Sequence, residues 1–205
     1  MDAHIREYVD KHLIPLAYRG LELLEQLTPP GRRTVKNTLV TCSGGLSVTL
    51  VPDDMPIVLQ VFLEDVYSKV KTFCQEVERL SLEQYLARPV SYYDDEHAIS
   101  FRKVIPLNQF TADMEQTYQS ARTKIEDISE DVGEALQALH QFELAHGDPS
   151  LDNIGYDTEA RRFVLFDFDK SITRATDHEK SRDFHQFQTS MHRSLNGVAP
   201  PLGSF

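Results

Sequence analysis

Three residues between positions 146 and 169 have the types and spacing that phosphoryl transfer requires. Asp148 lies in a polar segment after a helical one, where a carboxylate can accept the proton of a hydroxyl nucleophile. Asn153 follows five positions later, and Asp167 stands near the end of the apolar run FVLFDF. Amide and carboxylate oxygens are the ligands that Mg²⁺ prefers beside the phosphates of a nucleotide. These residues therefore indicate a site for a magnesium-bound nucleotide.

The same residues also have a purely structural interpretation. Asp152 and Asn153 together are typical of a turn. Asp167 is compatible with a helix cap or with an ion pair. The sequence alone leaves both interpretations open.

The apolar pattern predicts the elements that position these groups. A helix is expected over residues 3–27, broken or kinked at Pro15. Three strands rich in Val, Leu, Ile and Thr follow, then a helix over 64–86 and two further strands; the strand segments are VKNTLVT, LSVTLV, PIVLQVF, PVSYY and HAISFRKVI. The remainder is expected to be mainly helical up to residue 144, with one apolar strand and a last helix near 178–195. This order predicts an α+β chain with a strand-rich lobe followed by a helical lobe.

The composition excludes several classes of protein. The 205 residues have a net charge of −11, which argues against sequence-independent binding of nucleic acid. Cys42 and Cys74 are too few for a disulfide framework. No apolar run approaches the ~20 residues that span a bilayer, and the N-terminus lacks the apolar core of a secretory signal. We therefore expect a soluble, intracellular and cytoplasmic protein that binds neither nucleic acid nor membranes.

The motif H-G-D-x-x-x-x-N, from His146 to Asn153, and the D-F-D at 167–169 resemble the catalytic and metal-binding loops of the protein-kinase-like fold. Gly147 in this motif is similar to RIO-type and other small atypical kinases, and to the choline kinase and aminoglycoside phosphotransferase group. The resemblance implies a two-lobed fold with a small antiparallel-sheet N-lobe at about 31–108 and a reduced helical C-lobe at about 109–195. Residues 1–30 are expected to be a helical extension and 196–205 a flexible tail.

The resemblance also implies a role for each residue of the motif. Asp148 is expected to be the catalytic base, and Asn153 and Asp167 the ligands of Mg²⁺. His146 is expected to support the loop structurally. Asp169 is expected either to hold a second metal ion or to remain structural.

Four further positions are implied to contact the nucleotide. Gln60 occupies the position of the lysine that holds the α- and β-phosphates, and Glu76 is the candidate for the helix glutamate that pairs with that lysine; a solvated helix face is the alternative for Glu76. Gly44 and Gly45 are all that remains of a glycine-rich loop, and a plain hairpin turn is the alternative for them. Asp183 is expected to steady the catalytic loop through backbone hydrogen bonds.

The sequence departs from the family pattern where positive charge is expected. Gln60 is neutral, so Lys36 or Lys103 on neighbouring strands is a candidate to replace the missing lysine. Ser150 stands where many protein kinases carry a lysine near the transferred phosphate. Only sixteen positions separate Asp167 from Asp183, which leaves no room for a full activation segment.

These observations predict a kinase-like phosphotransferase that uses ATP and Mg²⁺. The acceptor is expected to be a hydroxyl of a protein Ser/Thr or of a small molecule. The alternative is a pseudokinase that serves as a nucleotide-binding or protein-interaction module, which the loss of the lysine at Gln60 favours. The oligomeric state does not follow from the sequence.

Overall fold

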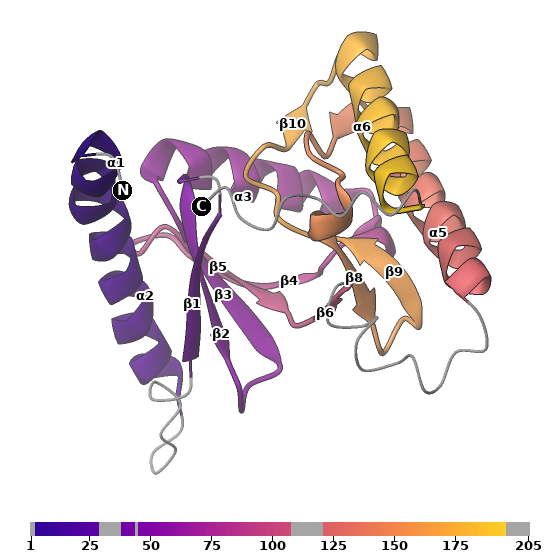
Figure 1. Ribbon diagram of the computed structural model, residues 1–205. Coiled ribbons are helices and arrows are strands. Elements are labelled where there is room, and N and C mark those ends of the chain that lie inside the picture. Colours follow the sequence, from indigo (N-terminus) through magenta and orange to yellow (C-terminus); the bar gives the residue numbers. More distant parts are fainter. Residues whose placement is uncertain (1–2, 29–37, 44, 108–120, 196–205) are drawn as a thin grey trace. The chain divides into compact units, whose positions relative to one another are not determined.

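The computed structural model describes residues 3–28, 38–43, 45–107 and 121–195 (Figure 1). The expected tail at 196–205 lies outside these residues. The chain forms two compact units, one made of Met1–Glu76 and Arg88–Lys103, the other of Val77–Ala87 and Val104–Phe205. The first unit contains an antiparallel sheet and the second is mainly helical, so the predicted α+β class is confirmed. In the described part of the chain, no helix is both long and apolar enough to cross a membrane.

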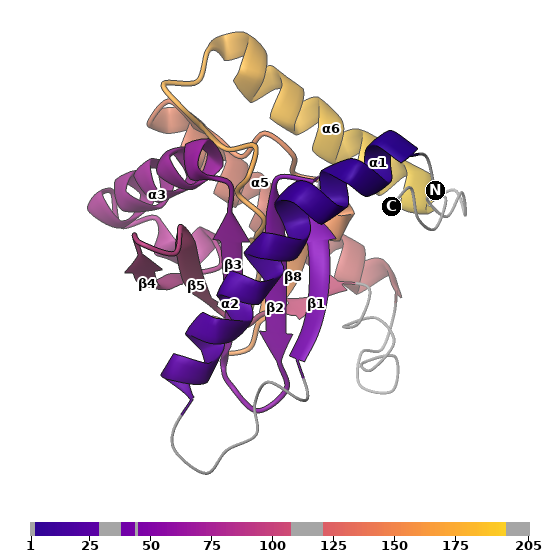
Figure 2. The same cartoon turned by 90° about the vertical axis from the view of Figure 1, so that its left-hand side faces the viewer.

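The N-terminal helical segment continues through Pro15 with a change of helix type. Helix α1 (Ala3–Tyr8) leads into a π-helical turn, η1 (Val9–Leu13), and then into α2 (Ile14–Leu27). Proline has no backbone N–H to donate, and it stands in the first turn of α2, where that donor is not needed. The predicted interruption at Pro15 is therefore a wider turn within one helical column, which crosses the sheet in Figure 2.

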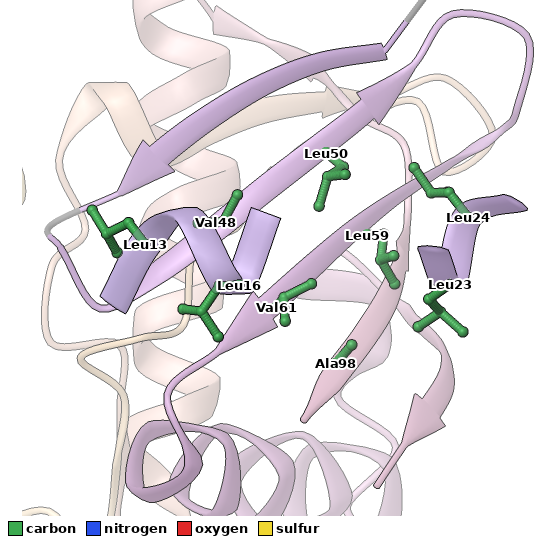
Figure 3. Packing of buried hydrophobic residues seen from close by; sticks show 9 residues of the cluster. All are labelled: Leu13, Leu16, Leu23, Leu24, Val48, Leu50, Leu59, Val61 and Ala98. Atoms are coloured by element: carbon green, nitrogen blue, oxygen red, sulfur yellow. The ribbon is translucent and has the colours of Figure 1, made fainter. Parts of the chain in front are cut away.

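The first unit is built on a five-stranded antiparallel sheet with the order β1-β2-β3-β5-β4. Its strands are β1 (Thr38–Ser43), β2 (Ser47–Pro52), β3 (Ile57–Phe62), β4 (Pro89–Tyr93) and β5 (Ala98–Arg102). Apolar side chains from η1 and α2 pack on alternate residues of β2 and β3 (Figure 3). Because successive residues of a strand point to opposite faces, Gln60, between the buried Leu59 and Val61, points away from α2.

Helix α3 (Glu64–Arg79) is shorter than the helix predicted over 64–86. Ser81 has a φ of 58°, a left-handed conformation that an α-helix cannot continue through. The N–H of Leu82 then donates to the carbonyl of Val77, which closes the last turn. A 3₁₀ turn, η3 (Glu83–Tyr85), occupies part of the remaining predicted helix.

The second unit contains two long helices and several short strands. Helix α5 (Ala121–Gln141) and helix α6 (Asp177–Leu195) pack against each other, and α6 begins with a capping box in which Thr176 and Glu179 exchange hydrogen bonds. The strands form a three-stranded sheet, β6-β8-β9, and a two-stranded one, β10-β7. Their bounds are β6 (Ile105–Pro106), β7 (Leu144–Ala145), β8 (Ile154–Asp157), β9 (Arg162–Leu165) and β10 (Ile172–Thr173). The sequence predicted β9 but not β7, β8 or β10, and β7 and β10 have only two residues each, too few to show an alternating pattern.

Candidate active site

The polar loop between β7 and β8 carries Asp148, whose carboxylate is held by two side chains from later in the chain. The ammonium Nζ of Lys170 lies 2.5 Å from Oδ2 of Asp148. The amide Nε2 of Gln186, on α6, donates to Oδ1. Partial burial opposes the charge on Lys170, but its hydrogen bond to Asp148 and the neighbouring carboxylates raise its pKa above the ordinary value. The carboxylate of Asp148 therefore lies beside a cation, and its side chain is still 18% exposed.

Asn153 closes the same loop, in the 3₁₀ turn η4 (Leu151–Asn153). Its amide Nδ2 donates to the backbone carbonyl of Asp148 at 2.9 Å, so these two residues are in direct contact. Its backbone N–H donates to the carbonyl of Ser150, and its carbonyl accepts from Phe166. Because the amide nitrogen is used inside the loop, the oxygen Oδ1 is the atom that Asn153 can offer to a cation.

Asp167 follows β9 with a φ of 66°, in the left-handed region that Asp tolerates better than most residues. Its neighbour Asp169 is buried, and its Oδ2 has no hydrogen-bond partner among the described residues. Burial, and next the charge of Asp167, raise the pKa of Asp169 to about 7. A cation beside these two carboxylates would favour the charged form of Asp169 and give its Oδ2 a partner.

His146 supports the loop from inside, as predicted. The ring is fully buried, its Nε2 donates to the carbonyl of Phe166 at 3.0 Å, and its Nδ1 accepts the N–H of Asp148 at 3.3 Å. Burial lowers the pKa of His146, which keeps the ring neutral and leaves Nδ1 able to accept. The ring thus links the catalytic loop to the backbone next to Asp167.

Asp183, on α6, anchors the start of the loop. Its fully buried carboxylate accepts the backbone N–H of His146 at 2.8 Å and that of Gly147 at 3.0 Å. His140 of α5 donates a third hydrogen bond from Nε2 at 3.2 Å. The predicted role of Asp183 is confirmed, whereas the sequence assigned no specific role to His140.

The candidates in the first unit have local partners. Gln60 is buried, and its Nε2 donates to Oγ of Ser47 at 2.9 Å. Gly45 has a φ of 75° in the β1–β2 turn, where its carbonyl accepts from the hydroxyl of Tyr8. A hairpin turn therefore accounts for Gly45, while Gly44 lies outside the described residues.

Lys103, a candidate to replace the missing lysine, has a local partner. Its Nζ donates to the carbonyl of Pro52 at 3.0 Å. Its backbone stands four positions beyond Ile99, the cross-strand partner of Gln60, which is about 13 Å along an extended chain. The other candidate, Lys36, is outside the described residues. Glu76 is partly buried on α3 and remains a candidate for the pairing residue.

Two residues at Asp148 were not predicted from the sequence, Lys170 and Gln186. The one available signal was that Lys170 directly follows the D-F-D motif. Gln186 stands on the same helix as Asp183 and three positions further along it, so both project from neighbouring turns toward the loop.

The residues at this site that could bind a metal ion offer both amide and carboxylate oxygens. Within the described residues, no three His, Cys, Asp or Glu side chains gather as a metal cluster. Mg²⁺ bound with a nucleotide needs only one or two carboxylates, because phosphates and waters complete its coordination. Asn153, Asp167 and the unsatisfied Asp169 fit that requirement.

One comparison with known proteins matches this part of the chain. Residues 100–199, just under half of the 205 residues, match the model of the lipopolysaccharide kinase (Kdo/WaaP) family. No curated protein is similar enough to the chain to count as a match. The matched segment contains the whole loop from His146 to Asn153 and the D-F-D. Similarity to this kinase family supports a kinase-like fold and a phosphotransferase activity.

Proposed function

We propose that this protein uses ATP and Mg²⁺ to phosphorylate a hydroxyl group of a saccharide. The observation that carries the proposal is that the loop with Asp148 and Asn153 is joined through His146 to the backbone next to Asp167. Asp183 accepts hydrogen bonds from the backbone of that loop, and the ring of His146 donates to the carbonyl of Phe166. Catalysis of phosphoryl transfer depends mainly on such positioning and on charge stabilisation.

In this proposal Asp148 receives the proton of the acceptor hydroxyl. The hydroxyl oxygen forms the new bond to the γ-phosphorus while the bond from that phosphorus to the β–γ bridging oxygen breaks. The electron pair of the broken bond leaves with ADP. The carboxylate of Asp148, which accepts a hydrogen bond from Lys170, suits the role of a group that accepts a proton.

Asn153 and Asp167 would hold Mg²⁺, with Asp169 as a third oxygen ligand or as a support for Asp167. When bound, the ion offsets the negative charge of the phosphates. The protein's contribution is to present Oδ1 of Asn153 from the catalytic loop and two carboxylates from the segment after β9. The unsatisfied Oδ2 of Asp169 is consistent with a cation as its missing partner.

The class of acceptor is taken from the family match. The family is described by its action on lipopolysaccharide, whose sugars offer alcohol groups. A protein Ser/Thr acceptor, the other expectation from the sequence, has no support from this match. Gln60, Glu76 and Gly45 remain candidates for nucleotide contacts.

A second candidate function is nucleotide binding without transfer. It is favoured by Gln60, which is neutral and already hydrogen-bonded to Ser47 where the resembling kinases carry a lysine. Such a protein would bind ATP without turning it over.

The test combines a binding and a transfer measurement on the full chain. ATP affinity is measured by calorimetry with and without Mg²⁺, and transfer is measured with γ-labelled ATP and a lipopolysaccharide preparation. Magnesium-dependent binding with label incorporated into saccharide supports the proposal. Binding without transfer supports the second candidate, and no binding to ATP in either condition rejects both.

A further inference from the structure

Lys170 places a cation at the candidate catalytic base although the catalytic loop itself has none. Ser150 cannot supply a charge at its position in the loop. The ammonium of Lys170 approaches the same carboxylate from the segment after the D-F-D, at 2.5 Å from Oδ2 of Asp148. The positive charge next to Asp148 therefore comes from a residue after the D-F-D and not from the catalytic loop.

The backbone of Lys170 is packed directly on the catalytic loop. A Cβ built on Gly147 would lie 2.1 Å from the carbonyl oxygen of Lys170 and 3.1 Å from its Cβ. Just beyond, Ser171 closes a tight turn by donating to the carbonyl of Phe168, and Ile172 pairs with Ala145 at the start of the loop. These contacts set the position of the Lys170 side chain relative to Asp148.

The ammonium has capacity for a further contact. It carries three donors, of which one is used by Asp148, and the side chain is 48% exposed. A hydroxyl bonded to Asp148 and poised for attack must lie about 3–3.5 Å from the γ-phosphorus. A cation that touches the same carboxylate is thus close enough to reach toward the transferred group.

On the premise of the proposed function, we propose that Lys170 is a catalytic residue whose ammonium contacts the transferring phosphoryl group as well as Asp148. The acceptor oxygen bonds to phosphorus, the bond to the bridging oxygen breaks with its electron pair going to ADP, and the proton goes to Asp148. Lys170 keeps its protons throughout and stabilises the negative charge on the phosphoryl oxygens. It supplies the charge that Ser150 lacks.

The opposite role for the same contact is a restraint that keeps Asp148 from its substrate. Lys170 and Gln186 together bind both oxygens of the carboxylate. If that contact were inhibitory, its removal would raise turnover. The two roles therefore predict changes of opposite sign.

The experiment uses the full chain with Lys170→Met and Lys170→Arg, and Lys180→Met as the matched control. Lys180 pairs with the fully exposed Asp177, 3.1 Å away on the same helix. Calorimetry measures the affinity for Mg-ADP alone and with aluminium fluoride, which imitates the transferring phosphoryl group. Hydrolysis of Mg-ATP, with water as acceptor, gives kcat and KM, and thermal unfolding checks that each variant folds.

Lys170→Met is expected to bind Mg-ADP with an affinity within about threefold of the wild type. Aluminium fluoride should tighten that binding about 10- to 100-fold less than it does in the wild type, and kcat should fall by a similar factor. Lys170→Arg should retain part of both effects, and Lys180→Met should match the wild type. Unchanged tightening in Lys170→Met, or faster hydrolysis, overturns the inference while leaving the proposed function intact. A wild-type protein that binds no Mg-ADP rejects the proposed function, and the inference with it.

Discussion

Gly147 and Lys170 are in direct backbone contact: a Cβ at position 147 would lie 2.1 Å from the carbonyl oxygen of Lys170. Gly147 also has a φ of 85°, which other residues adopt only with strain. The contact joins the loop that carries Asp148 to the segment that follows the D-F-D. It gives a physical reason for glycine, the smallest residue, between His146 and Asp148.

Gly147→Ala is expected to lower the free energy of unfolding by about 2–5 kcal/mol, because it adds backbone strain and a clash with main-chain atoms. The measurement is chemical denaturation. Gly133→Ala is the control, since a Cβ there meets nothing within 4 Å and alanine favours the helix by about 0.5–1 kcal/mol. Equal stability of the two variants would contradict the contact.

Asp183→Asn is expected to destabilise the protein by about 1–3 kcal/mol, since a neutral amide replaces a buried carboxylate that accepts three hydrogen bonds. The same substitution at Asp177, which is fully exposed on the same helix, should cost much less. Denaturation curves for both variants check this. A larger loss at Asp177 would show that Asp183 is not the anchor.

Asp148→Asn and Asp167→Asn are expected to separate catalysis from metal binding. The first removes the base and should lower turnover about 100-fold or more, with the affinity for Mg-ATP nearly unchanged. The second should weaken binding in the presence of Mg²⁺ and have little effect in its absence. Turnover and calorimetric affinity measured on the same preparations test both, and equal residual activity in the two variants would point to a contaminating kinase.

Gln60→Lys is expected to tighten ATP binding by about tenfold to a hundredfold, if position 60 faces the phosphates and Glu76 can pair with the new ammonium. Lys103→Met is the comparison, and it should leave the affinity unchanged because Lys103 is bound to the carbonyl of Pro52. Calorimetry on both variants gives the result. A change of less than threefold in the ATP affinity of Gln60→Lys would show that the phosphates are bound elsewhere.

The sequence was sufficient to predict the features that depend on local chemistry. Helical periodicity predicted α2, α3 and α6, and β-rich runs between turn residues predicted the five strands of the larger sheet. The spacing of Asp148 and Asn153 within one motif likewise brings them together, because only five positions separate them. The role of Asp183 followed from its resemblance to a known pattern and is confirmed by its hydrogen bonds.

Only the tertiary structure decided which side chains meet across long separations. Lys170 and Gln186 reach Asp148 from 22 and 38 positions further along the chain, a convergence that depends on how β10 and α6 pack around the loop. The two-residue strands β7 and β10 exist because they pair with each other, since neither has enough residues to show a periodic pattern. The sequence determined the chemistry of the loop, and packing determined its neighbours, because local propensity acts over a few residues whereas burial and long-range hydrogen bonds act over the whole fold.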